Sequence, residues 1–283
     1  MKGFIFALLL LVSPALAEQT IPEHLQAISV TVRAGGSSGS GVIKTRDGVH
    51  YVWTAGHVVD GLRKTREILV DGSKRTVVEF SDPKVVQKIT DQTGKIIGEF
   101  SLDCEVLRFS GAEKQDLALL RIRKRDFLKD SVQFHITDDN LAVGTELYHV
   151  GSLLGDFGSN SLTDGIISQN GRLLFDGIEF VQTTATAYPG SSGGGIFTKA
   201  DGKYCAMLVR GSGESYNLAI PVHRMKKWAA KSGIMFAMDD SVAVPSEEEL
   251  DKLPIDTDGE GAAGDAPHAH SLEYPVLLHR PSQ

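Results

Sequence analysis

The 283-residue sequence contains only two cysteines, Cys104 and Cys205, and has no long apolar run beyond its first residues. Two cysteines allow one disulfide, but the sequence does not show whether these two lie close together. We favour two separately buried thiols, with pairing after export as the alternative. Because no later stretch is long and apolar enough to cross a bilayer, we expect no membrane-spanning segment in the processed protein.

Strong charge is also missing from most of the chain. The formal net charge is −7, but residues 239–265 alone hold ten acidic residues and one lysine, so the remainder is close to neutral. A neutral body offers neither a basic surface for nucleic acid nor attraction to anionic lipid. We therefore expect no nucleic acid and no membrane among the partners.

The first 17 residues, MKGFIFALLLLVSPALA, combine a short basic start, an apolar core and small residues at Ala15 and Ala17. This is the pattern of a secretory signal peptide that is removed before Glu18. A permanent N-terminal anchor is the alternative, although the apolar run is short for one. The pattern predicts a secreted or periplasmic location.

Short runs rich in β-branched and aliphatic residues recur between residues 27 and 220, and turn signals such as Asp47-Gly48 separate many of them. Many short strands with such turns favour an antiparallel barrel or sandwich. No alternation of helices and strands argues for a parallel sheet. One helix is expected near the end of this region, over residues 222–233.

The composition changes after residue 237. Residues 238–283 are acidic and poor in aromatic side chains, which predicts a disordered tail, so that truncation after Met238 should leave a folded domain. His268 and His270 fit solvated tail residues better than metal ligands. We expect a solubilising extension, and the alternative is that its end, residues 271–283, docks on the folded part.

Two stretches combine glycine and serine: AGGSSGSGV at residues 34–42 and AYPGSSGGGIF at residues 187–197. A serine nucleophile needs a base, a carboxylate that orients the base, and backbone N–H donors for an oxyanion. His57 in YVWTAGHVVD follows an apolar strand, and Asp116 in EKQDLALLRI precedes one. Taken alone, His57 fits an ordinary surface or core histidine better, and Asp116 fits an ordinary acid at the start of a strand better.

Three motifs in the order His, Asp, Ser, namely TAGHVV, DLALLRI and GSSGGG, resemble those of chymotrypsin-fold serine proteases. The HtrA or Deg branch is the most similar, because GGSSGSGVI at residues 35–43 resembles the strand that precedes its histidine strand. The resemblance covers residues 27–237. It implies an all-β protease domain over residues 18–237, with two six-stranded antiparallel β-barrels and a C-terminal helix. The chain departs from that branch in one respect: the residues after Gly233 are tail-like and too few for the PDZ domain that usually follows, so we expect none.

The family pattern Gly-x-Ser-Gly-Gly implies that Ser192, and not Ser191, is the nucleophile. By the same resemblance, His57 is the general base and Asp116 orients it. The backbone N–H groups of Gly190 and Ser192 would form the oxyanion hole. No metal and no organic cofactor is implied.

The resemblance also implies a pocket for the side chain that precedes the scissile bond, lined by the segments 208–212 and 217–219 and by the residue pair before the oxyanion loop. No acidic residue occupies its floor, so cleavage after a small or aliphatic residue is expected and cleavage after Lys or Arg is disfavoured. Glutamyl-type specificity, with Arg210 attracting an acidic side chain, is the alternative. The expected substrate-binding residues are Thr186, Ala187, Arg210, Gly211 and Ala219.

Together these observations predict a secreted serine endopeptidase that acts on protein or peptide substrates through an acyl-enzyme and is a monomer. A catalytically inactive binding module of the same fold is the first alternative. An ester hydrolase that uses the same site is the second, because a fold alone does not determine a substrate.

Overall fold

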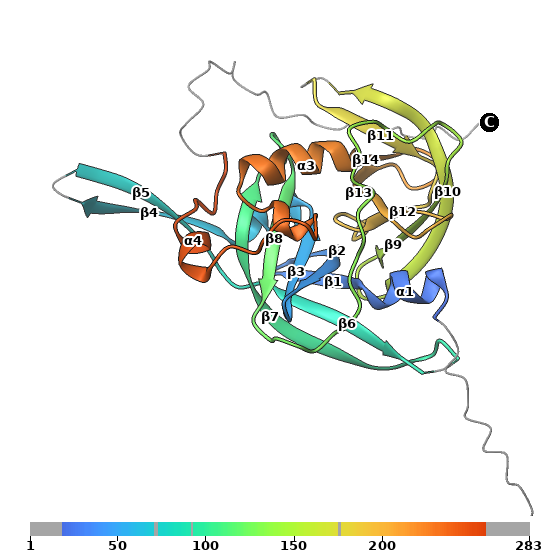
Figure 1. The fold of residues 1–283 in the computed structure, drawn as a ribbon, viewed down its shortest axis with the longest axis horizontal. Helices are drawn as coiled ribbons and strands as arrows, with labels where there is room; N and C mark the ends of the chain where they lie inside the picture. The colour runs from blue at the N-terminus through green and yellow to red at the C-terminus, as the bar shows by residue number, and fades with distance from the viewer. Residues whose placement is uncertain (1–18, 71–72, 92, 175–176, 259–283) are drawn as a thin grey trace, which may run out of the picture.

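The chain forms two closed barrels that pack against each other (Figure 1). A computed structural model describes residues 19–70, 73–91, 93–174 and 177–258. Each barrel has six strands, and all neighbouring strands in the barrels pair antiparallel. The expected all-β class and the two six-stranded barrels are therefore confirmed. The expected signal peptide lies outside the described residues.

The first barrel closes in the order β1-β2-β3-β8-β7-β6. Its strands are β1 (Ser29–Ala34), β2 (Ser37–Arg46), β3 (Val49–Thr54), β6 (Lys84–Thr90), β7 (Ile96–Ser110) and β8 (Leu117–Ile122). Between β3 and β6 the chain forms a separate two-stranded sheet, β4 (Arg63–Val70) and β5 (Ser73–Phe80), which projects from the body as an arm (Figure 1).

The second barrel closes in the order β10-β11-β14-β13-β12-β9. Its strands are β9 (Glu146–Leu153), β10 (Gly158–Leu173), β11 (Glu179–Thr183), β12 (Gly195–Thr198), β13 (Tyr204–Gly211) and β14 (Asn217–Pro221). The helical elements are α1 (Ile21–Ala27), α2 (Gly56–Val59), η1 (Asp60–Leu62), α3 (Val222–Lys231), η2 (Met235–Ala237) and α4 (Glu247–Asp251). The helix expected near the end of the domain is α3.

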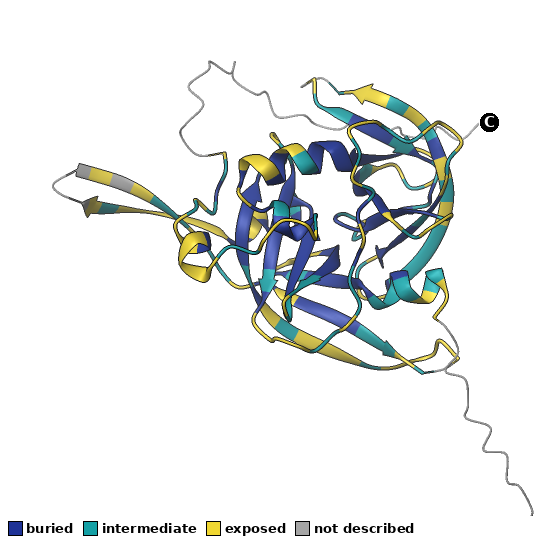
Figure 2. Cartoon of the chain, in the orientation of Figure 1, coloured by how far each residue is buried: buried dark blue, intermediate teal, exposed yellow. Residues whose placement is uncertain are grey.

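The apolar runs of the strands form a core that extends through the first barrel, into the second and under α3 (Figure 2). Trp53 of β3 is fully buried and lies edge-on to Trp228 of α3, with 5.8 Å between the ring centroids. Its indole Nε1 donates to the carbonyl of Ala237 at 2.9 Å. Burial of large aromatic rings is among the strongest contributions to a core, so α3 and η2 are integral parts of the fold.

Residues 238–258 pack against the first barrel, so the expectation of a disordered tail is wrong for this part of the chain. Leu250 of α4 is 2% exposed and joins the core. Lys44 of β2 is 1% exposed, and its Nζ lies 2.8 Å from Oδ1 of Asp240. The acidic composition misled because individual acids pair with basic groups of the barrel and a few apolar residues anchor the segment. The expected tail from residue 259 onward lies outside the described residues.

Both cysteines are buried and free, and they lie in different barrels: Cys104 on β7 and Cys205 on β13. Burial raises the pKa of each thiol to about 12, so neither is a thiolate near neutral pH. Within the described ranges, no helix has the length and apolar character needed to cross a bilayer. No three His, Cys, Asp or Glu side chains gather as a metal site in the same part of the chain.

Candidate active site

His57 and Asp116 meet at the end of the first barrel. His57 lies on the single helical turn α2 that follows β3, and Asp116 immediately precedes β8. Both carboxylate oxygens of Asp116 lie 3.0 Å from Nδ1 of His57, and Oδ1 also accepts the backbone N–H of His57 at 2.9 Å. The carboxylate therefore fixes the imidazole with Nδ1 as the donor, which leaves Nε2 free to accept a proton.

The turn before β8 gives Asp116 its orientation. Asp116 is 2% exposed and has a φ of 55°, a left-handed conformation that aspartate adopts more readily than most residues. Its backbone N–H donates to the carbonyl of Gly111 at 3.0 Å. The carboxylate of Asp258 holds the start of this turn, because it accepts from Ser110 Oγ at 2.7 Å and from the Gly111 N–H at 2.6 Å. The segment that the sequence indicated to be a tail thus supports the aspartate turn.

Ser192 lies in the loop between β11 and β12, where hydrogen bonds set the direction of each peptide unit. The carbonyl of Pro189 accepts from the N–H of Leu154 at 2.8 Å, so the N–H of Gly190 points the opposite way. The carbonyl of Ser191 accepts from Gly194 N–H at 2.9 Å, so the N–H of Ser192 points away from Gly194. Within the part of the chain that the structure describes, neither N–H has an acceptor. Two unpaired donors beside a serine are suited to hold an oxyanion.

Gly190 is required in this loop. Its φ of +95° lies in the region that residues with a β-carbon avoid, and a β-carbon here would collide with the carbonyl of Ser152. The sequence pattern therefore reflects a real backbone constraint at this glycine.

Ser40 ties the serine loop to the first barrel, a role that sequence reasoning missed. It lies on β2, in the glycine- and serine-rich stretch that resembled a second catalytic loop. Its N–H donates to the carbonyl of Ser192 at 2.7 Å, and its Oγ donates to the carbonyl of Gly190 at 2.7 Å. The same Oγ accepts the N–H of Ser152 at 2.7 Å. Residues 34–42 thus position the loop that carries Ser192 in the other barrel. In the sequence, only the resemblance to the family motif could have indicated this role.

The two adjacent serines are oriented differently. Ser191 is 1% exposed, and its Oγ accepts the backbone N–H of Tyr188 at 3.2 Å. Ser192 is partly exposed, and its Oγ donates to the carbonyl of Val209 on β13 at 3.4 Å. The structure brings His57 and Asp116 into direct contact, whereas Ser192 Oγ bonds to β13 and, within the described residues, makes no hydrogen bond to the imidazole.

The structure places the five expected pocket residues in different surroundings. Ala187 N–H donates to the carbonyl of Gly213 at 3.1 Å, so the segment before the serine loop lies beside the turn after β13. Arg210 is held elsewhere: its guanidinium lies 5.3 Å from the ring centroid of Phe180 and donates to the carbonyl of Ala112 at 3.2 Å. The positions of the other three are as follows: Thr186 is half-buried, Gly211 is exposed at the end of β13, and Ala219 is fully buried on β14.

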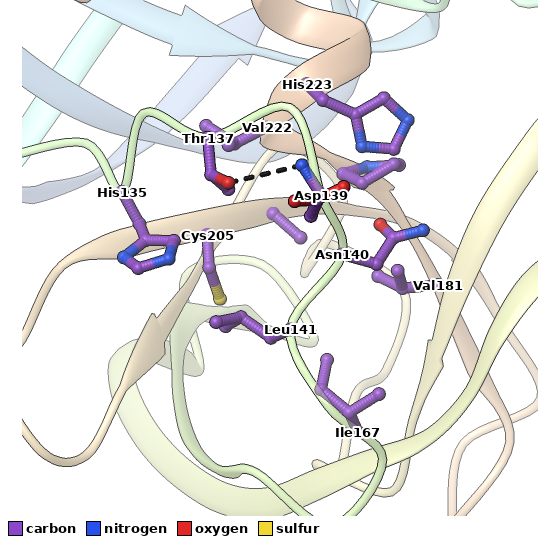
Figure 3. A pocket seen from close by; sticks show the side chains of 12 residues that line it. His135, Thr137, Asp139, Asn140, Leu141, Ile167, Val181, Cys205, Val222 and His223 are labelled. Atoms are coloured by element: carbon purple, nitrogen blue, oxygen red, sulfur yellow. Dashed lines mark hydrogen bonds between the residues drawn. The ribbon is translucent and has the colours of Figure 1, made fainter.

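A separate small pocket lies beside the second barrel, next to the start of α3 (Figure 3). His135, Cys205 and His223 are among its lining residues, and none of the expected site residues is. The raised pKa of Cys205 argues against a thiolate nucleophile in this pocket. The site that combines a base, a carboxylate and oriented N–H groups is therefore the one around His57.

His149 of β9 is fully buried next to the strand that follows the serine loop, and its Nδ1 donates to the carbonyl of Gly195 at 3.0 Å. Burial lowers its pKa from 6.5 to about 4. The unfolded chain binds this proton below about pH 6.5 and the folded chain does not, so stability falls as the pH decreases from about 6.5 toward 4, by up to ~3 kcal/mol.

Replacing this histidine by His149→Asn keeps a donor and removes the titration. We expect the variant to lose about 2–3 kcal/mol less of its free energy of unfolding between pH 7 and pH 4.5 than the natural protein loses. Urea unfolding at the two pH values measures this difference. His24→Asn, at a partly exposed histidine, is the control for the same exchange of residue types outside the core. Equal acid sensitivity in all three proteins would contradict the prediction.

Two antiparallel barrels, with a paired histidine and aspartate on the first and a glycine-rich serine loop on the second, define the class of chymotrypsin-fold serine peptidases. The family model for the trypsin-like peptidase domain matches residues 39–207, and the chain belongs to that family.

Individual relatives agree with this class. The chain is 29% identical over 201 residues to the serine protease Do-like HtrA of Bacillus subtilis, covering 67% of this chain and 38% of that protein. It is 32% identical over 184 residues to a probable periplasmic serine endoprotease DegP-like of Pseudomonas fulva, covering 64% and 31%. The chain thus spans about a third of the length of these curated relatives. The crystal structure of the serine endoprotease from Yersinia pestis shares the fold, with a TM-score of 0.54 at 22% identity over 75% of this chain and 64% of that one.

Proposed function

We propose that this chain is a serine endopeptidase in which Ser192 attacks a peptide carbonyl. His57 Nε2 takes the hydroxyl proton as the Oγ–carbon bond forms, and the N–H groups of Gly190 and Ser192 hold the resulting oxyanion. The C–N bond then breaks, and the imidazolium gives its proton to the leaving amine. Water, deprotonated by His57, hydrolyses the acyl-enzyme, while Asp116 stabilises the imidazolium in both steps.

The observation that carries this proposal is the direction of the peptide units around Ser192. Leu154 and Gly194 hold the carbonyls of Pro189 and Ser191, which fixes the direction of the next N–H groups, and within the described residues neither N–H has an acceptor. Buried or partly buried N–H groups are rarely left without an acceptor, and in a peptidase the substrate's oxyanion is that acceptor. The bidentate contact between His57 and Asp116 supports the same proposal.

We further propose that the substrates are proteins or peptides cut after small or aliphatic residues. Glutamyl-type specificity is less well supported, because Phe180 and Ala112 already engage the guanidinium of Arg210. A secreted or periplasmic location fits the sequence of residues 1–17 and the Pseudomonas fulva relative, which is described as a probable periplasmic endoprotease. We expect a monomer that requires neither nucleic acid, nor a membrane, nor a cofactor.

One observation favours a second candidate, an inactive binding module. Ser192 Oγ donates to the carbonyl of Val209 and not to His57. Such a serine becomes a nucleophile only after its side chain rotates toward the imidazole, and a protein in which it stays on Val209 would bind peptides without cutting them.

Labelling with a fluorescent fluorophosphonate separates the two candidates. A peptidase forms a covalent adduct at Ser192, because the reagent needs an activated serine and free N–H donors for its phosphoryl oxygen. We expect labelling of the natural protein, blocked by prior heat denaturation, together with hydrolysis of an unstructured protein such as casein. A folded protein that neither reacts nor cleaves would support the binding module. Labelling with ester hydrolysis but no peptide turnover would indicate an esterase.

A further inference from the structure

The turn over residues 111–116, which carries the aspartate of the site, is contacted by two arginines from outside the first barrel. Arg210 of β13 donates from its guanidinium to the carbonyl of Ala112 at 3.2 Å. Arg224 of α3 donates from one guanidinium nitrogen to the carbonyl of Gln115 at 3.4 Å and to the side-chain Oε1 of the same residue at 3.3 Å. The turn is therefore held by β13 and α3 as well as by the C-terminal segment.

Arg224 is fixed in one orientation by the strand β11. It is 8% exposed, and its guanidinium carbon lies over the ring of Phe180, 5.0 Å from the ring centroid. Its other terminal nitrogen donates to the carbonyl of Glu179 at 2.8 Å. Because a guanidinium is planar and its donors form a rigid fork, the ring and this carbonyl determine where the nitrogen that meets the turn lies.

The peptide unit between Gln115 and Asp116 is held at both of its polar groups. Its carbonyl accepts from Arg224, and its N–H donates to the carbonyl of Gly111 at 3.0 Å. The φ of Asp116 is 55°, a left-handed conformation that persists only where the surroundings enforce it. Because φ is the rotation of the α-carbon against the preceding peptide unit, the arginine takes part in setting the direction of the carboxylate.

Strand β13 joins this turn to the serine. The carbonyl of Val209 accepts from Ser192 Oγ at 3.4 Å, and the next residue along the strand, Arg210, holds the carbonyl of Ala112. A displacement of β13 would therefore act on the serine and on the aspartate turn together. The contacts from β13 and α3 place the aspartate in the same frame as the serine.

We propose that Arg224 is a positioning residue of this site, which holds the peptide unit before Asp116 so that the carboxylate accepts from Nδ1 of His57. Arg210 supports the same turn from β13. Arg224 acts through the turn and not by contact with the reacting atoms. The inference rests on the proposed function for its effect on turnover, whereas its effect on the hydrogen bond between the aspartate and the histidine does not depend on catalysis.

The experiment uses Arg224→Met in the full chain, because methionine keeps an unbranched apolar side chain against Phe180 and removes the guanidinium. We expect kcat on one fluorogenic peptide to fall by about 10–100-fold, since a displacement of about 1 Å in an active site can cost about 100-fold in rate. KM should change by no more than about twofold, because the residue acts through Asp116. Proton NMR supplies a second readout: the signal of the His57 Nδ1–H lies downfield while the carboxylate accepts this proton, and the folded variant should lose it.

Arg46→Met is the matched control. Arg46 of β2 has a side chain that is 11% exposed, and it donates to the backbone carbonyls of Asp239 and Val242 at 2.9 Å each. This variant should keep both kcat and the downfield signal. Arg224→Lys should recover only part of each, because an ammonium lacks the planar fork that reaches Glu179 and the turn together. If Arg224→Met does not fold, Arg224→Lys decides, with a lowered kcat and a weakened signal as the expected result.

A folded Arg224→Met protein that keeps both the natural kcat and the downfield signal would overturn the proposal. An equal loss in Arg46→Met, or absence of the signal from the natural protein, would overturn it as well. Failure of the proposed function has a different signature. A natural protein that cleaves nothing, yet shows a downfield signal that Arg224→Met loses, would contradict the peptidase and retain the positioning role. An active peptidase whose turnover and signal are indifferent to Arg224→Met would do the reverse.

Discussion

Replacing Ser192 by alanine is expected to abolish peptide hydrolysis, while Ser191→Ala should keep most of it. Removal of a serine nucleophile lowers kcat by about 10⁶-fold in a peptidase of this type, which places the variant below a practical detection limit. Ser191 differs, because its hydroxyl is buried and accepts only the N–H of Tyr188. Its loss removes one neutral hydrogen bond, which costs about 1 kcal/mol of stability.

The measurement is kcat/KM on one fluorogenic peptide for both variants, with circular dichroism to show that each is folded. Both replacements are Ser to Ala at adjacent positions, so they control for each other in size and in the loss of a hydroxyl. An inactive Ser191→Ala beside an active Ser192→Ala, both folded, would show that the motif was aligned one residue out. Loss of activity in both variants would indicate that the buried Ser191 hydroxyl is needed to shape the oxyanion loop.

The sequence was sufficient for the architecture because barrels depend on patterns that a chain carries locally. Apolar runs separated by turn signals specify short antiparallel strands, and the ordered His, Asp and Ser motifs placed them in one family. His57 and Asp116 lie together because the turn after β3 and the turn before β8 meet at one end of the first barrel, where those two strands pair side by side. The proximity of His57 and Asp116 follows from the fold, and the sequence motifs predicted that fold.

The remaining features depend on contacts between distant segments, which no local pattern encodes. Ser40 looked like part of a spare glycine-serine stretch, yet it bonds to the loop of the other barrel. Asn217 begins a segment that the resemblance assigned to the pocket, but the sequence does not reveal its hydrogen bond to the carbonyl of Ala185, 32 residues earlier in the chain. The sequence indicates no partner for the charge of Arg210, but in the folded protein its guanidinium contacts the ring of Phe180 and the carbonyl of Ala112. Each of these depends on a partner far away in the chain.

Residues 238–258 are the longest segment that the sequence mispredicted. Their acidic composition as a whole predicted disorder, but individual acidic side chains pair with specific basic residues of the barrel. Asp240 pairs with Lys44, and Asp256 pairs with Arg63, with 2.5 Å between the nearest nitrogen and oxygen atoms. A net negative charge predicts disorder only when the charges have no fixed partners.

Truncation after Met238 is therefore expected to leave a protein that does not fold stably. Leu250 is part of the core, and deleting a buried leucine side chain alone costs about 2–5 kcal/mol. Lys44 would keep a buried ammonium group without Asp240. Because Asp240 is half exposed, that cost lies below the roughly 3–5 kcal/mol of a fully buried pair. Arg108, which is 1% exposed, would lose the carbonyl of Leu250 as an acceptor.

The backbone loses partners as well. The N–H of Phe109 donates to the carbonyl of Ile255 at 2.8 Å, and the N–H of Thr257 donates to the carbonyl of Phe109 at 2.9 Å. Together with the losses at Leu250 and Lys44, these are of the order of the whole stability of a domain, about 5–15 kcal/mol. The turn that carries Asp116 would also lose the bonds that Asp258 makes to Ser110 and Gly111.

Truncation after Asp258 is the matched control, since it removes only residues that none of these contacts involves. Thermal unfolding followed by circular dichroism, with peptide turnover measured in parallel, compares the two truncated proteins with the full chain. We expect the longer protein to melt cooperatively near the full chain and to keep its activity, and the shorter one to lack a cooperative transition at 25 °C or above. A shorter protein that melts and cleaves like the longer one would show that the segment only rests on the barrel. A shorter protein that neither melts cooperatively nor cleaves would show that residues 239–258 are part of the folded core of the first barrel and support the turn that carries Asp116.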